Sequence, residues 1–383
     1  MNILHISPYV PSTRANHAGG VCMGKQIETL AINNNVYNLA FINDNLERTL
    51  AKSFEKDTSS FVSSNKLTMA LNALKTLYRP NLFGIRNSIC FSFKLIHMVK
   101  KYNIDAIHAE FTAMGQFLWI KHFFPRLQFN LVEHDVTLQS YERMANMYSG
   151  IKGLHYKIQR DLVKSKEKKY CTKADNVFTF NDKDKKLLKK FYDVDAIVLT
   201  PYYGLDIKEN NKNDKIPGSI CFVGQMARQE NHDAAMRLVD IFNSINNDGL
   251  SLYLIGAKPR EELLQRQNEK IHCTGFVEDI NKEIEKCELA VFPLTFGAGI
   301  KLKVLLAFGL GLPVITSSIG AEGIDEEGKV LILAESDDSY KKEITKLIRN
   351  KSLLNELSKK STQYVSENFG WEKSVKILND IYH

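Results

Sequence analysis

Short apolar runs alternate with helical periodicity along most of the chain. Runs rich in β-branched and aromatic residues are typical of buried strands, and apolar residues every three to four positions are typical of amphipathic helices. Because strands separated by helices pair in parallel with both faces covered, this alternation predicts an α/β fold. The strands predicted in the first half are Asn2–Ile6, Val36–Phe41, Asp105–Ala109, Phe129–Glu133, Val177–Phe180 and Ala196–Leu199. The clearest helices there are Gly20–Ile32, Val136–Met147 and Ile151–Lys173.

The alternation restarts after a polar stretch, LDIKENNKNDKIPG, which shows no apolar periodicity and is interpreted as a linker. The pattern therefore predicts two doubly wound domains with a cleft between them at the carboxyl ends of their strands, where such sheets bind ligands. The second-half strands are Ser219–Val223, Ser251–Ile255, Ile271–Cys273, Leu289–Phe292 and Pro313–Thr316. Its helices are Asn231–Phe242, Pro259–Asn268, Ile280–Lys286, Ile300–Phe308, Tyr340–Ile348 and a closing pair split near Phe369–Trp371.

One segment, Lys66–Tyr102, does not follow the alternation and mixes aromatic, aliphatic and basic residues. It has two interpretations. Either it forms a pair of amphipathic helices covering the first sheet, or it is an interfacial patch that rests on anionic lipid or admits a lipid-linked substrate.

Composition narrows the class of protein. Hydrophobic residues make up 44% and charged residues 25% of the 383 residues, which is typical of a globular chain. The formal charge of +7 fits an anionic partner such as a nucleotide or a lipid phosphate, whereas nucleic-acid binders usually carry a denser basic stripe. Six cysteines without a CxxC pair indicate reduced thiols, not a disulfide framework or a zinc site. Apolar runs fall short of the roughly 18 residues of a membrane span, so we expect a cytoplasmic protein.

Two candidate motifs lie in the first half. Gly19 and Gly20 stand between the first strand and its helix, where glycine permits close approach to a ligand and a helix N-terminus offers N–H groups to an anion. The absence of GxGxxG there argues against a dinucleotide fold. His134 ends a strand in Glu133-His134-Asp135, at the cleft edge, and Asp135 is a candidate cap for the next helix.

Two further motifs lie in the second half. In FVGQMARQENHDAA a strand runs into Gly224, and Arg228 in the following loop is suited to bidentate pairing with a phosphate. In FPLTFGAGIKLK a small-residue loop precedes a helix predicted to open at Ile300, with Lys301 and Lys303 in its first turn. Cations there oppose the helix dipole, so a bound anion would relieve the conflict. Each of these arginine and lysine residues has the alternative of being a solvated surface cation.

The order of the motifs resembles bacterial GT-B glycosyltransferases of the family 4 type, the glycosyl transferases group 1. The likeness runs nearly end to end. It rests on ISPYVPS…AGG, EHD…YERMA, ADNVFTFNDKD, LTPYYGLD, FVGQMARQENHDAA, FVEDI, VFPLTFGAGIKLKVLLAFGLGLPVITSSIGAEGI and FGWEKSVKIL.

The resemblance implies a retaining enzyme, of the hexosyltransferase type, that moves a sugar from a nucleotide-diphosphate sugar to a glycan or lipid-linked acceptor in surface polysaccharide or glycoconjugate synthesis. It implies an acceptor-binding Rossmann-like domain over residues 1–204, to which the terminal helix at 370–383 crosses back. The donor-binding Rossmann-like domain would span 217–369. Neither a cofactor nor a metal is implied, because lysine and arginine stabilise the leaving diphosphate. A peripheral contact with the inner face of an anionic membrane is implied as well.

The resemblance also assigns residues. His134 matches a histidine near the transferred sugar, and Arg228 with one or both of Lys301 and Lys303 neutralises the donor diphosphate. The predicted catalytic residues are His134, Arg228 and Lys303. Backbone groups from Gly297 through Ala298 and Gly299 to Ile300 contact phosphate and sugar. Gly19 and Gly20 approach the same phosphates across the cleft. The predicted donor-binding residues are Gly19, Gly20, Gly224, Arg228, Gly297, Ala298, Gly299, Ile300, Lys301 and Lys303.

Three positions depart from the family pattern. Ala298 and Leu306 stand where the family carries a pair of glutamates, and Gln225 stands where many relatives have arginine. Since Leu306 cannot accept a hydrogen bond from a ribose hydroxyl, losing that charged contact would cost about 1.5–3 kcal/mol of binding. Leu306 and Ala298 motivate an alternative function, a non-catalytic GT-B subunit that binds an acceptor or a partner enzyme. A GT-B nucleotide-sugar epimerase is a further alternative.

Overall fold

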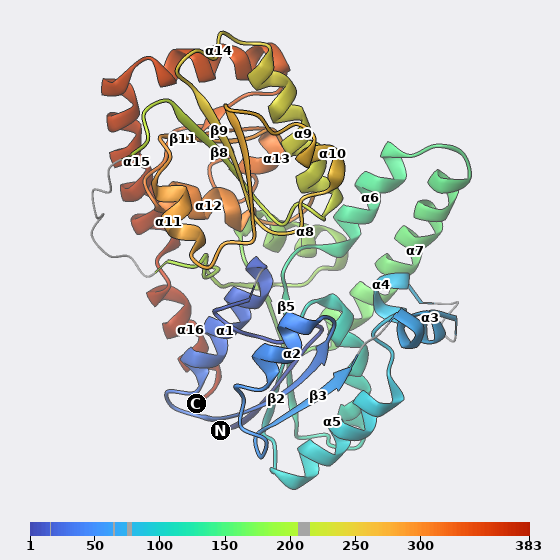
Figure 1. Cartoon of the computed structure of the whole chain (residues 1–383). Coiled ribbons are helices and arrows are strands. Elements are labelled where there is room, and N and C mark those ends of the chain that lie inside the picture. The colour runs from blue at the N-terminus through green and yellow to red at the C-terminus, as the bar shows by residue number, and fades with distance from the viewer. Residues whose placement is uncertain (16, 64–65, 75–78, 206–214) are drawn as a thin grey trace. The chain divides into compact units, whose positions relative to one another are not determined.

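The chain divides into two compact units. The computed structural model describes residues 1–15, 17–63, 66–74, 79–205 and 215–383 (Figure 1). Unit 1 comprises Met1–Tyr202 and Trp371–His383, and unit 2 comprises Tyr203–Gly370. Nine of the fourteen residues of the predicted linker, 206–214, lie outside the described residues. A cleft between two domains stays a prediction.

Unit 1 is built on a parallel sheet with the strand order β3-β2-β1-β4-β5-β6-β7. Its central strands are buried over almost their whole length, as expected for strands covered on both faces. The strands are β1 (Asn2–Ser7), β2 (Asn35–Ile42), β3 (Ser59–Ser63), β4 (Ala106–Glu110), β5 (Gln128–Glu133), β6 (Asn176–Thr179) and β7 (Ile197–Val198).

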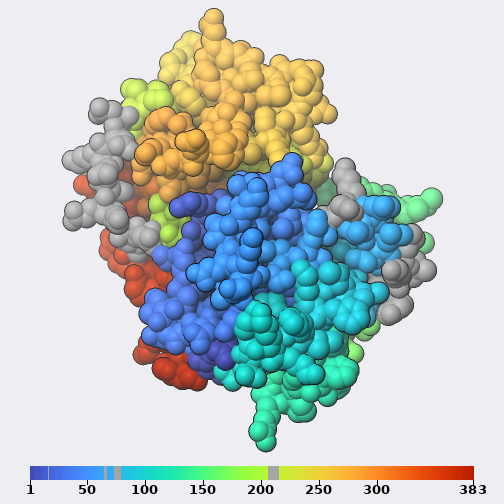
Figure 2. All heavy atoms as spheres, turned by 60° about the horizontal axis from the view of Figure 1, so that its bottom comes forward, coloured from blue at the N-terminus to red at the C-terminus, as the bar shows by residue number. Residues whose placement is uncertain are grey.

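Helices cover this sheet, and several begin at a side-chain cap. Asp44, Ser88 and Asn181 accept a backbone N–H in the first turn of α2, α5 and α8. Helix α5 packs on β2 and β3, and cyan atoms of this part of the chain lie at the surface in the view of Figure 2. The helices are α1 (Ala18–Leu30), α2 (Asn45–Ala51), α3 (Lys66–Leu74), α4 (Asn81–Gly84), α5 (Ile89–Lys101), the 3-10 helix η1 (Thr112–His122), α6 (Thr137–Met147), α7 (Gly150–Lys173), α8 (Asp182–Tyr192) and α16 (Glu372–Ile381).

Unit 2 has a second parallel sheet, in the order β10-β9-β8-β11-β12-β13. Its strands are β8 (Ser219–Val223), β9 (Ser251–Ile255), β10 (Ile271–Gly275), β11 (Leu289–Phe292), β12 (Val314–Thr316) and β13 (Ile332–Leu333). Its helices are α9 (Gln229–Asn243), α10 (Glu261–Leu264), α11 (Ile280–Glu285), α12 (Leu302–Gly309), α13 (Ser318–Ala321), α14 (Asp337–Ile348) and α15 (Lys351–Phe369).

Each sheet reverses its strand order once. The reversal lies between β1 and β4 in unit 1 and between β8 and β11 in unit 2. Loops leave such a point in opposite directions, so the carboxyl ends of these strands open a crevice in which doubly wound sheets bind ligands. The predicted site residues in the two units follow strands at or beside these points.

The last helix, α16, belongs to unit 1 although it follows unit 2 in the sequence. The indole of Trp371 donates to the hydroxyl of Thr29 at 3.0 Å, and the hydroxyl of Ser374 donates to the carbonyl oxygen of Thr200 at 2.9 Å. At the end of the helix the Tyr382 hydroxyl lies 2.6 Å from Nδ1 of buried His108. The predicted return of the terminal helix to the first domain is therefore present within unit 1.

The predicted strands are confirmed to within two residues at each end, but several elements differ. Helix α1 begins at Ala18, two residues before its predicted start. Helix α12 begins at Leu302 and not at Ile300, and α9 begins at Gln229. The short strands β3 and β13 and the helix η1 were not predicted, because short or aperiodic segments carry little pattern. No helix within the described residues is long and apolar enough to cross a membrane.

The segment Lys66–Tyr102 contains α3, α4 and α5, and its residues 75–78 lie outside the described residues. Helix α5 buries Phe91, Leu95 and Met98 in the core of unit 1, as the covering interpretation expects. Ile89 and Phe93 of the same helix are exposed. A lipid-facing role for this segment stays a prediction.

We expect Tyr382→Phe to lower the free energy of unfolding of unit 1 by about 1–3 kcal/mol, because buried His108 loses its hydroxyl partner. Trp119 and Trp371 both belong to unit 1, so tryptophan fluorescence during urea unfolding reports on this unit. Tyr364→Phe is the matched control in unit 2, where the hydroxyl donates to the carbonyl oxygen of Ile324. Equal fluorescence transitions for Tyr382→Phe and the unchanged chain would contradict the assigned role of α16.

Candidate functional site

In unit 2 a small-residue loop leaves β11 beside the strand reversal. Gly297 has φ 133° and Gly299 has φ 66°, values that side-chain-bearing residues rarely adopt. Ala298 lies between them, and Ile300 precedes α12, whose N-cap position is occupied by Lys301. The glycines therefore permit the tight path that returns the chain from β11 to the start of α12.

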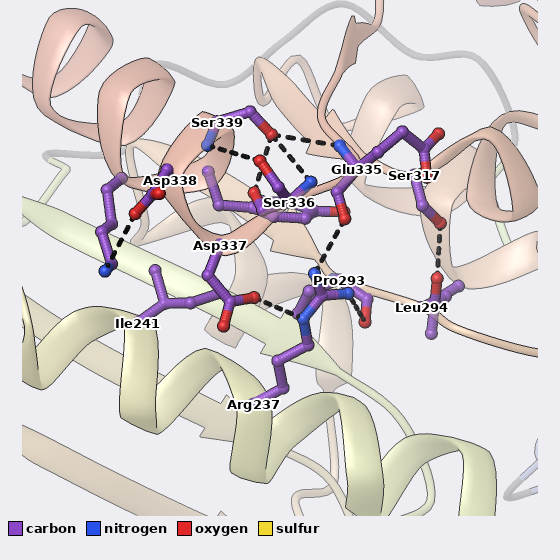
Figure 3. Close-up of polar contacts among 12 residues, drawn as sticks. Arg237, Ile241, Pro293, Leu294, Ser317, Glu335, Ser336, Asp337, Asp338 and Ser339 are labelled. Carbon is purple, nitrogen blue, oxygen red and sulfur yellow. Dashed lines mark hydrogen bonds and ion pairs between the residues drawn. The ribbon is translucent and has the colours of Figure 1, made fainter.

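The base of this loop is held by side chains from neighbouring elements (Figure 3). Arg237 of α9 donates to Asp337 at 2.8 Å, to the carbonyl oxygen of Glu335 at 2.9 Å and to that of Pro293 at 3.4 Å. The hydroxyl of Ser317 donates to the carbonyl oxygen of Leu294 at 2.6 Å. These contacts fix the ends of β11, β12 and β13 relative to α9 and α14.

Lys303 lies in the first turn of α12 and reaches toward β8. Its ammonium donates to Oδ1 of Asn231, and the Asn231 amide donates to the carbonyl oxygen of Gln225 at 2.9 Å. Gly224 makes this approach possible, because a Cβ there would stand 2.9 Å from Cγ of Asn231. The N–H of Gly224 already donates to the carbonyl oxygen of Ile255. Gly224 therefore provides space at the site and not a free N–H group.

Three cations meet here. Burial lowers the pKa of Lys303 to about 7; the charge of Glu230 opposes this shift, and the charges of Lys301 and Arg228 add to it. Arg228 is exposed at the start of α9 and lies 3.7 Å from Glu230. The structure thus brings Arg228, Lys301 and Lys303 close enough to repel one another.

Lys301 differs from Lys303 in its contacts. Its ammonium donates to the carbonyl oxygens of Gly299 at 2.6 Å and Ala298 at 3.1 Å, and it lies 3.8 Å from Glu322. Lys301 therefore binds the backbone of its own loop, whereas Lys303 and Arg228 place positive charge beside that loop. Because repulsion among the three cations is relieved by a bound anion, this cluster is suited to a phosphate group.

The family glutamate position is occupied by a core residue. Leu306 is 8% exposed and packs in unit 2 near Gly204. Ala298 carries no side-chain hydrogen-bonding group. The cation cluster is present, whereas these two positions offer no carboxylate.

In unit 1 the buried carboxylate of Glu110, at the end of β4, is surrounded by three histidines. His134 Nε2 lies 2.6 Å, His108 Nε2 3.2 Å and His5 Nε2 3.5 Å from its oxygens. Burial raises the pKa of Glu110, but the hydrogen bonds from His108, His134 and His5 outweigh it, and the pKa lies well below its ordinary value. Glu110 is therefore ionised and accepts hydrogen bonds only.

His134 is held on several sides. Its ring stacks on Phe111 with centroids 3.6 Å apart, and Phe180 meets it edge-on at 4.7 Å. Phe111 has φ 68°, a conformation that costs a non-glycine residue on the order of 1–3 kcal/mol and that turns its ring onto His134. The side chain of His134 remains 9% exposed.

The tautomers in this cluster follow from the ionised carboxylate. His134 donates its Nε2–H to Glu110, which leaves Nδ1 as an acceptor when the ring is neutral. His108 likewise donates from Nε2, to Glu110 and to Oε1 of Gln26, and its Nδ1 accepts the Tyr382 hydroxyl. The network therefore runs from α16 and α1 to His134.

Gly19 and Gly20 lie in the first turn of α1 and not in a loop before it. A Cβ on Gly19 would stand 3.0 Å from the Phe111 ring and 3.6 Å from Nδ1 of His134, so these three residues come together. The N–H of Gly20 donates to Nδ1 of His17 at 3.0 Å. The N–H of Gly20 is therefore used by the cap of α1, and an approach of Gly19 and Gly20 to the donor phosphates stays a prediction.

Asp135 is not the cap of α6, because the N-cap position belongs to Val136. The N–H groups of Thr137 and Leu138 instead donate to the two carboxylate oxygens of Glu167 on α7, at 2.7 and 3.1 Å. The carboxylate of Glu167, thirty residues further along the chain, therefore takes the place of a neighbouring side-chain cap for α6. This contact joins α6 and α7 into one hairpin.

Glu110, Phe111 and Asn231 are the site residues that the sequence did not single out. Glu110 ends the apolar strand AIHAE, and the available signal was a charged residue at the end of a strand predicted to be buried. Among the described residues, no group of His, Cys, Asp and Glu is arranged to hold a metal ion.

Three comparisons with known proteins bear on these sites. Residues 217–350, which lie in unit 2, match the family described as glycosyl transferases group 1. An uncharacterized glycosyltransferase of Methanocaldococcus jannaschii is 28% identical over 216 residues, which span 53% of this chain and 53% of that protein. The chain thus matches about half the length of this curated relative.

Solved structures resemble the whole chain. Sucrose-phosphate synthase of Thermosynechococcus elongatus superposes with a TM-score of 0.72 at 14% identity, covering 100% of this chain and 98% of that one. HepE of Anabaena, solved in complex with UDP, has a TM-score of 0.70 at 13% identity and covers 100% and 99%. These likenesses confirm the predicted GT-B fold class.

We expect Glu110→Gln to release His134 from the Nε2–H tautomer, because the amide cannot replace an ionised acceptor that receives several donors. ¹⁵N spectra of labelled histidine in the free protein should show the His134 ring nitrogens shifting toward a mixture of tautomers. Glu47→Gln is the control, since it changes a different buried carboxylate, 3.9 Å from His17. Unchanged His134 shifts in Glu110→Gln would show that Glu110 does not position this ring.

A second expectation concerns pH. Burial, and then the charge of Glu167, raise the pKa of Glu133 well above its ordinary value, and burial raises that of Glu167 to about 7. A raised carboxyl pKa stabilises the fold fully below the unfolded value and loses this contribution as pH rises through the folded value. Tm followed by tryptophan fluorescence should therefore fall as pH rises from the ordinary carboxyl pKa of 4.5 through about 7, and fall less in Glu133→Gln. Parallel slopes for the two proteins would contradict the coupling.

Proposed function

We propose, from the match of residues 217–350 to the glycosyl transferases group 1, that this chain transfers a sugar from a nucleotide-diphosphate sugar to a glycan or lipid-linked acceptor. The proposal includes retention of the anomeric configuration and a place in surface polysaccharide or glycoconjugate synthesis. The observation that carries it is the cluster of Arg228, Lys301 and Lys303 beside the glycine loop, within the matched residues 217–350.

The cluster is suited to a leaving diphosphate. Lys303 and Arg228 supply charge that is not consumed by a buried carboxylate, and Lys301 holds the loop of Gly297–Ile300 in shape. As the sugar–phosphate bond breaks, negative charge grows on the diphosphate, and pre-placed cations stabilise that charge without reorganising. We infer that unit 2 binds the donor through these residues and needs no metal ion for this step. HepE of Anabaena, which shares the fold, has been solved with UDP-glucose.

His134 is the proposed catalytic residue of unit 1. Its Nδ1, turned away from Glu110, is suited to accept a hydrogen bond from a sugar hydroxyl. Departure of the diphosphate and attack by the acceptor hydroxyl on the same face would retain configuration without a covalent intermediate. A shared ligand for Gly19, Gly20 and His134 stays a prediction.

The alternative function, a non-catalytic subunit, is favoured by one observation. Leu306 is buried and Ala298 offers no hydrogen-bonding side chain, so the ribose contact that the family pattern provides is missing. A subunit of this kind would keep the fold and bind an acceptor or a partner enzyme without turning over donor.

Calorimetry against UDP, GDP, ADP, TDP and CMP separates the two functions. Saturable binding of one nucleoside diphosphate would support the transferase and identify the base. Lys301→Ala with Lys303→Ala should then raise Kd at least about tenfold, equivalent to about 1.4 kcal/mol. Failure of the folded protein to bind any of the five would favour the non-catalytic subunit.

Binding should also take up protons. Lys303 titrates near pH 7 in the free protein, and a bound diphosphate raises its pKa by favouring the charged form. At about pH 8, where the free amine is mostly neutral, we expect up to one proton taken up per nucleotide, and weaker affinity as pH rises further. Titrations in buffers of different ionisation enthalpy measure this uptake. Lys303→Met should abolish it, and Lys282→Met, an exposed lysine in unit 2, should not.

A further inference from the structure

A row of exposed apolar side chains runs along the tip of the hairpin formed by α6 and α7, which projects from unit 1 (Figure 1). Ile151 is 91% exposed, Leu154 59% and Ile158 53%. Spaced three and four residues apart, they share one face of α7. Met147, at the end of α6, is 60% exposed. Because the outward face of a helix in a globular protein is ordinarily polar, such a row indicates a surface that another body covers.

The hairpin is held rigidly behind this row. Further along α7, Val163, Tyr170 and Cys171 are buried in the core of unit 1. Gln159 accepts the N–H of Asn81 at 2.7 Å, and Glu167 accepts the first N–H groups of α6. The opposite side of the helix is therefore fixed to the unit, and the apolar row cannot turn inward to be buried.

Positive charge surrounds the row. Helix α7 carries eight lysine and arginine residues against Asp161 and Glu167, so most of the formal charge of +7 of the whole chain belongs to this one helix. Lys152 and Lys157 are exposed beside the row, and further exposed lysines follow toward the end of the helix. The two acidic residues of α7 add little negative charge to its exposed surface, because Glu167 is buried and Asp161 pairs with Arg160 at 2.8 Å.

Aromatic side chains lie at the turn of the hairpin. Tyr148 and Tyr156 stack with centroids 5.2 Å apart, and the Lys152 ammonium lies 3.4 Å from the centroid of the Tyr148 ring. Tyrosine is enriched where a protein meets the headgroup layer, because its ring is apolar and its hydroxyl remains hydrated. The tip thus combines aliphatic, aromatic and cationic groups in one short segment.

We propose that the α6–α7 tip docks on an anionic lipid bilayer, with Ile151, Leu154 and Ile158 inserted at the boundary of headgroups and acyl chains and the flanking lysines on lipid phosphates. An interfacial helix of this kind needs an apolar row and cations beside it, and α7 has both. A specific protein interface of similar size would carry hydrogen-bonding groups among its apolar residues, at about one bond per 100–200 Å². Lipid therefore fits this uninterrupted aliphatic row better than a protein partner.

The docking goes beyond the proposed transfer and needs neither donor nor acceptor. It also involves a segment different from Lys66–Tyr102, the stretch for which the sequence offered a lipid-facing interpretation. For a lipid-linked acceptor, it would hold unit 1 at the surface where that acceptor resides.

The test is flotation of the full chain with vesicles of phosphatidylcholine alone or with about one third phosphatidylglycerol. We expect binding to the anionic vesicles that weakens as salt is added, and little binding to the neutral ones. The variant Ile151→Ser/Leu154→Ser/Ile158→Ser should lower the partition coefficient at least about tenfold, and Lys152→Gln/Lys157→Gln should lower its salt dependence. The matched control Ile32→Ser/Phe276→Ser removes exposed apolar residues elsewhere and should bind like the unchanged chain.

A depth measurement completes the test. In Ile151→Trp the emission of the added tryptophan, after subtraction of the unchanged chain, should shift to the blue on anionic vesicles. Equal flotation of the triple-serine variant and the unchanged chain would overturn the proposal, as would failure of the unchanged chain to bind anionic vesicles. Self-association of the unchanged chain without lipid, lost in the triple-serine variant, would identify the row as a protein interface and also overturn it. Nucleotide binding is measured without vesicles. Failure of the lipid-docking proposal can therefore be distinguished from failure of the proposed sugar transfer.

Discussion

A single buried charge constrains the centre of unit 1. The Glu110 carboxylate has no exposed surface, and an ion taken out of water is stable only when donors surround it. His108 on β4 and His134 after β5 donate to this carboxylate, and His5 on β1, paired in register with His108, lies 3.5 Å from it. Because every donor has to be in place at once, the strands, α1 and α16 are tied to one geometry. His134 is the outermost member of that arrangement, and its position is a consequence of what lies beneath it.

Unit 2 brings positive charges together, whereas unit 1 buries a negative one. Three cations are gathered around a loop whose own carbonyl oxygens satisfy only Lys301, and the pKa of Lys303 falls because burial disfavours its charged form. The fold therefore holds the two units in different electrostatic states. In unit 1 a buried anion is surrounded by hydrogen-bond donors, and in unit 2 three cations lie close enough to repel one another.

The parts predicted well from sequence were those governed by local pattern. Buried parallel strands are short apolar runs in the sequence, so the predicted bounds of β8, β9 and β11 agree with the structure residue for residue. The loop at 297–300 and the two lysines after it were identified from their composition. The parts missed depend on partners distant in the chain. Asp135 looked like a cap because it is local, but Glu167 fills that role from the next helix. Nothing near AIHAE in the sequence shows that Glu110 meets His5 and His134.

The connection of α16 to unit 1 has a consequence for how the protein is made. The hydroxyl that completes the pairing of His108 comes from Tyr382, which is synthesised only after all of unit 2. A nascent chain can fold the sheet of unit 1 early, but its buried polar network stays one partner short until translation has passed the second unit. Unit 2, continuous in sequence, can finish first. The unit that begins the chain is therefore the last to mature, and a ribosome that stalls within unit 2 would leave His108 and the ring of His134 above it without their final support.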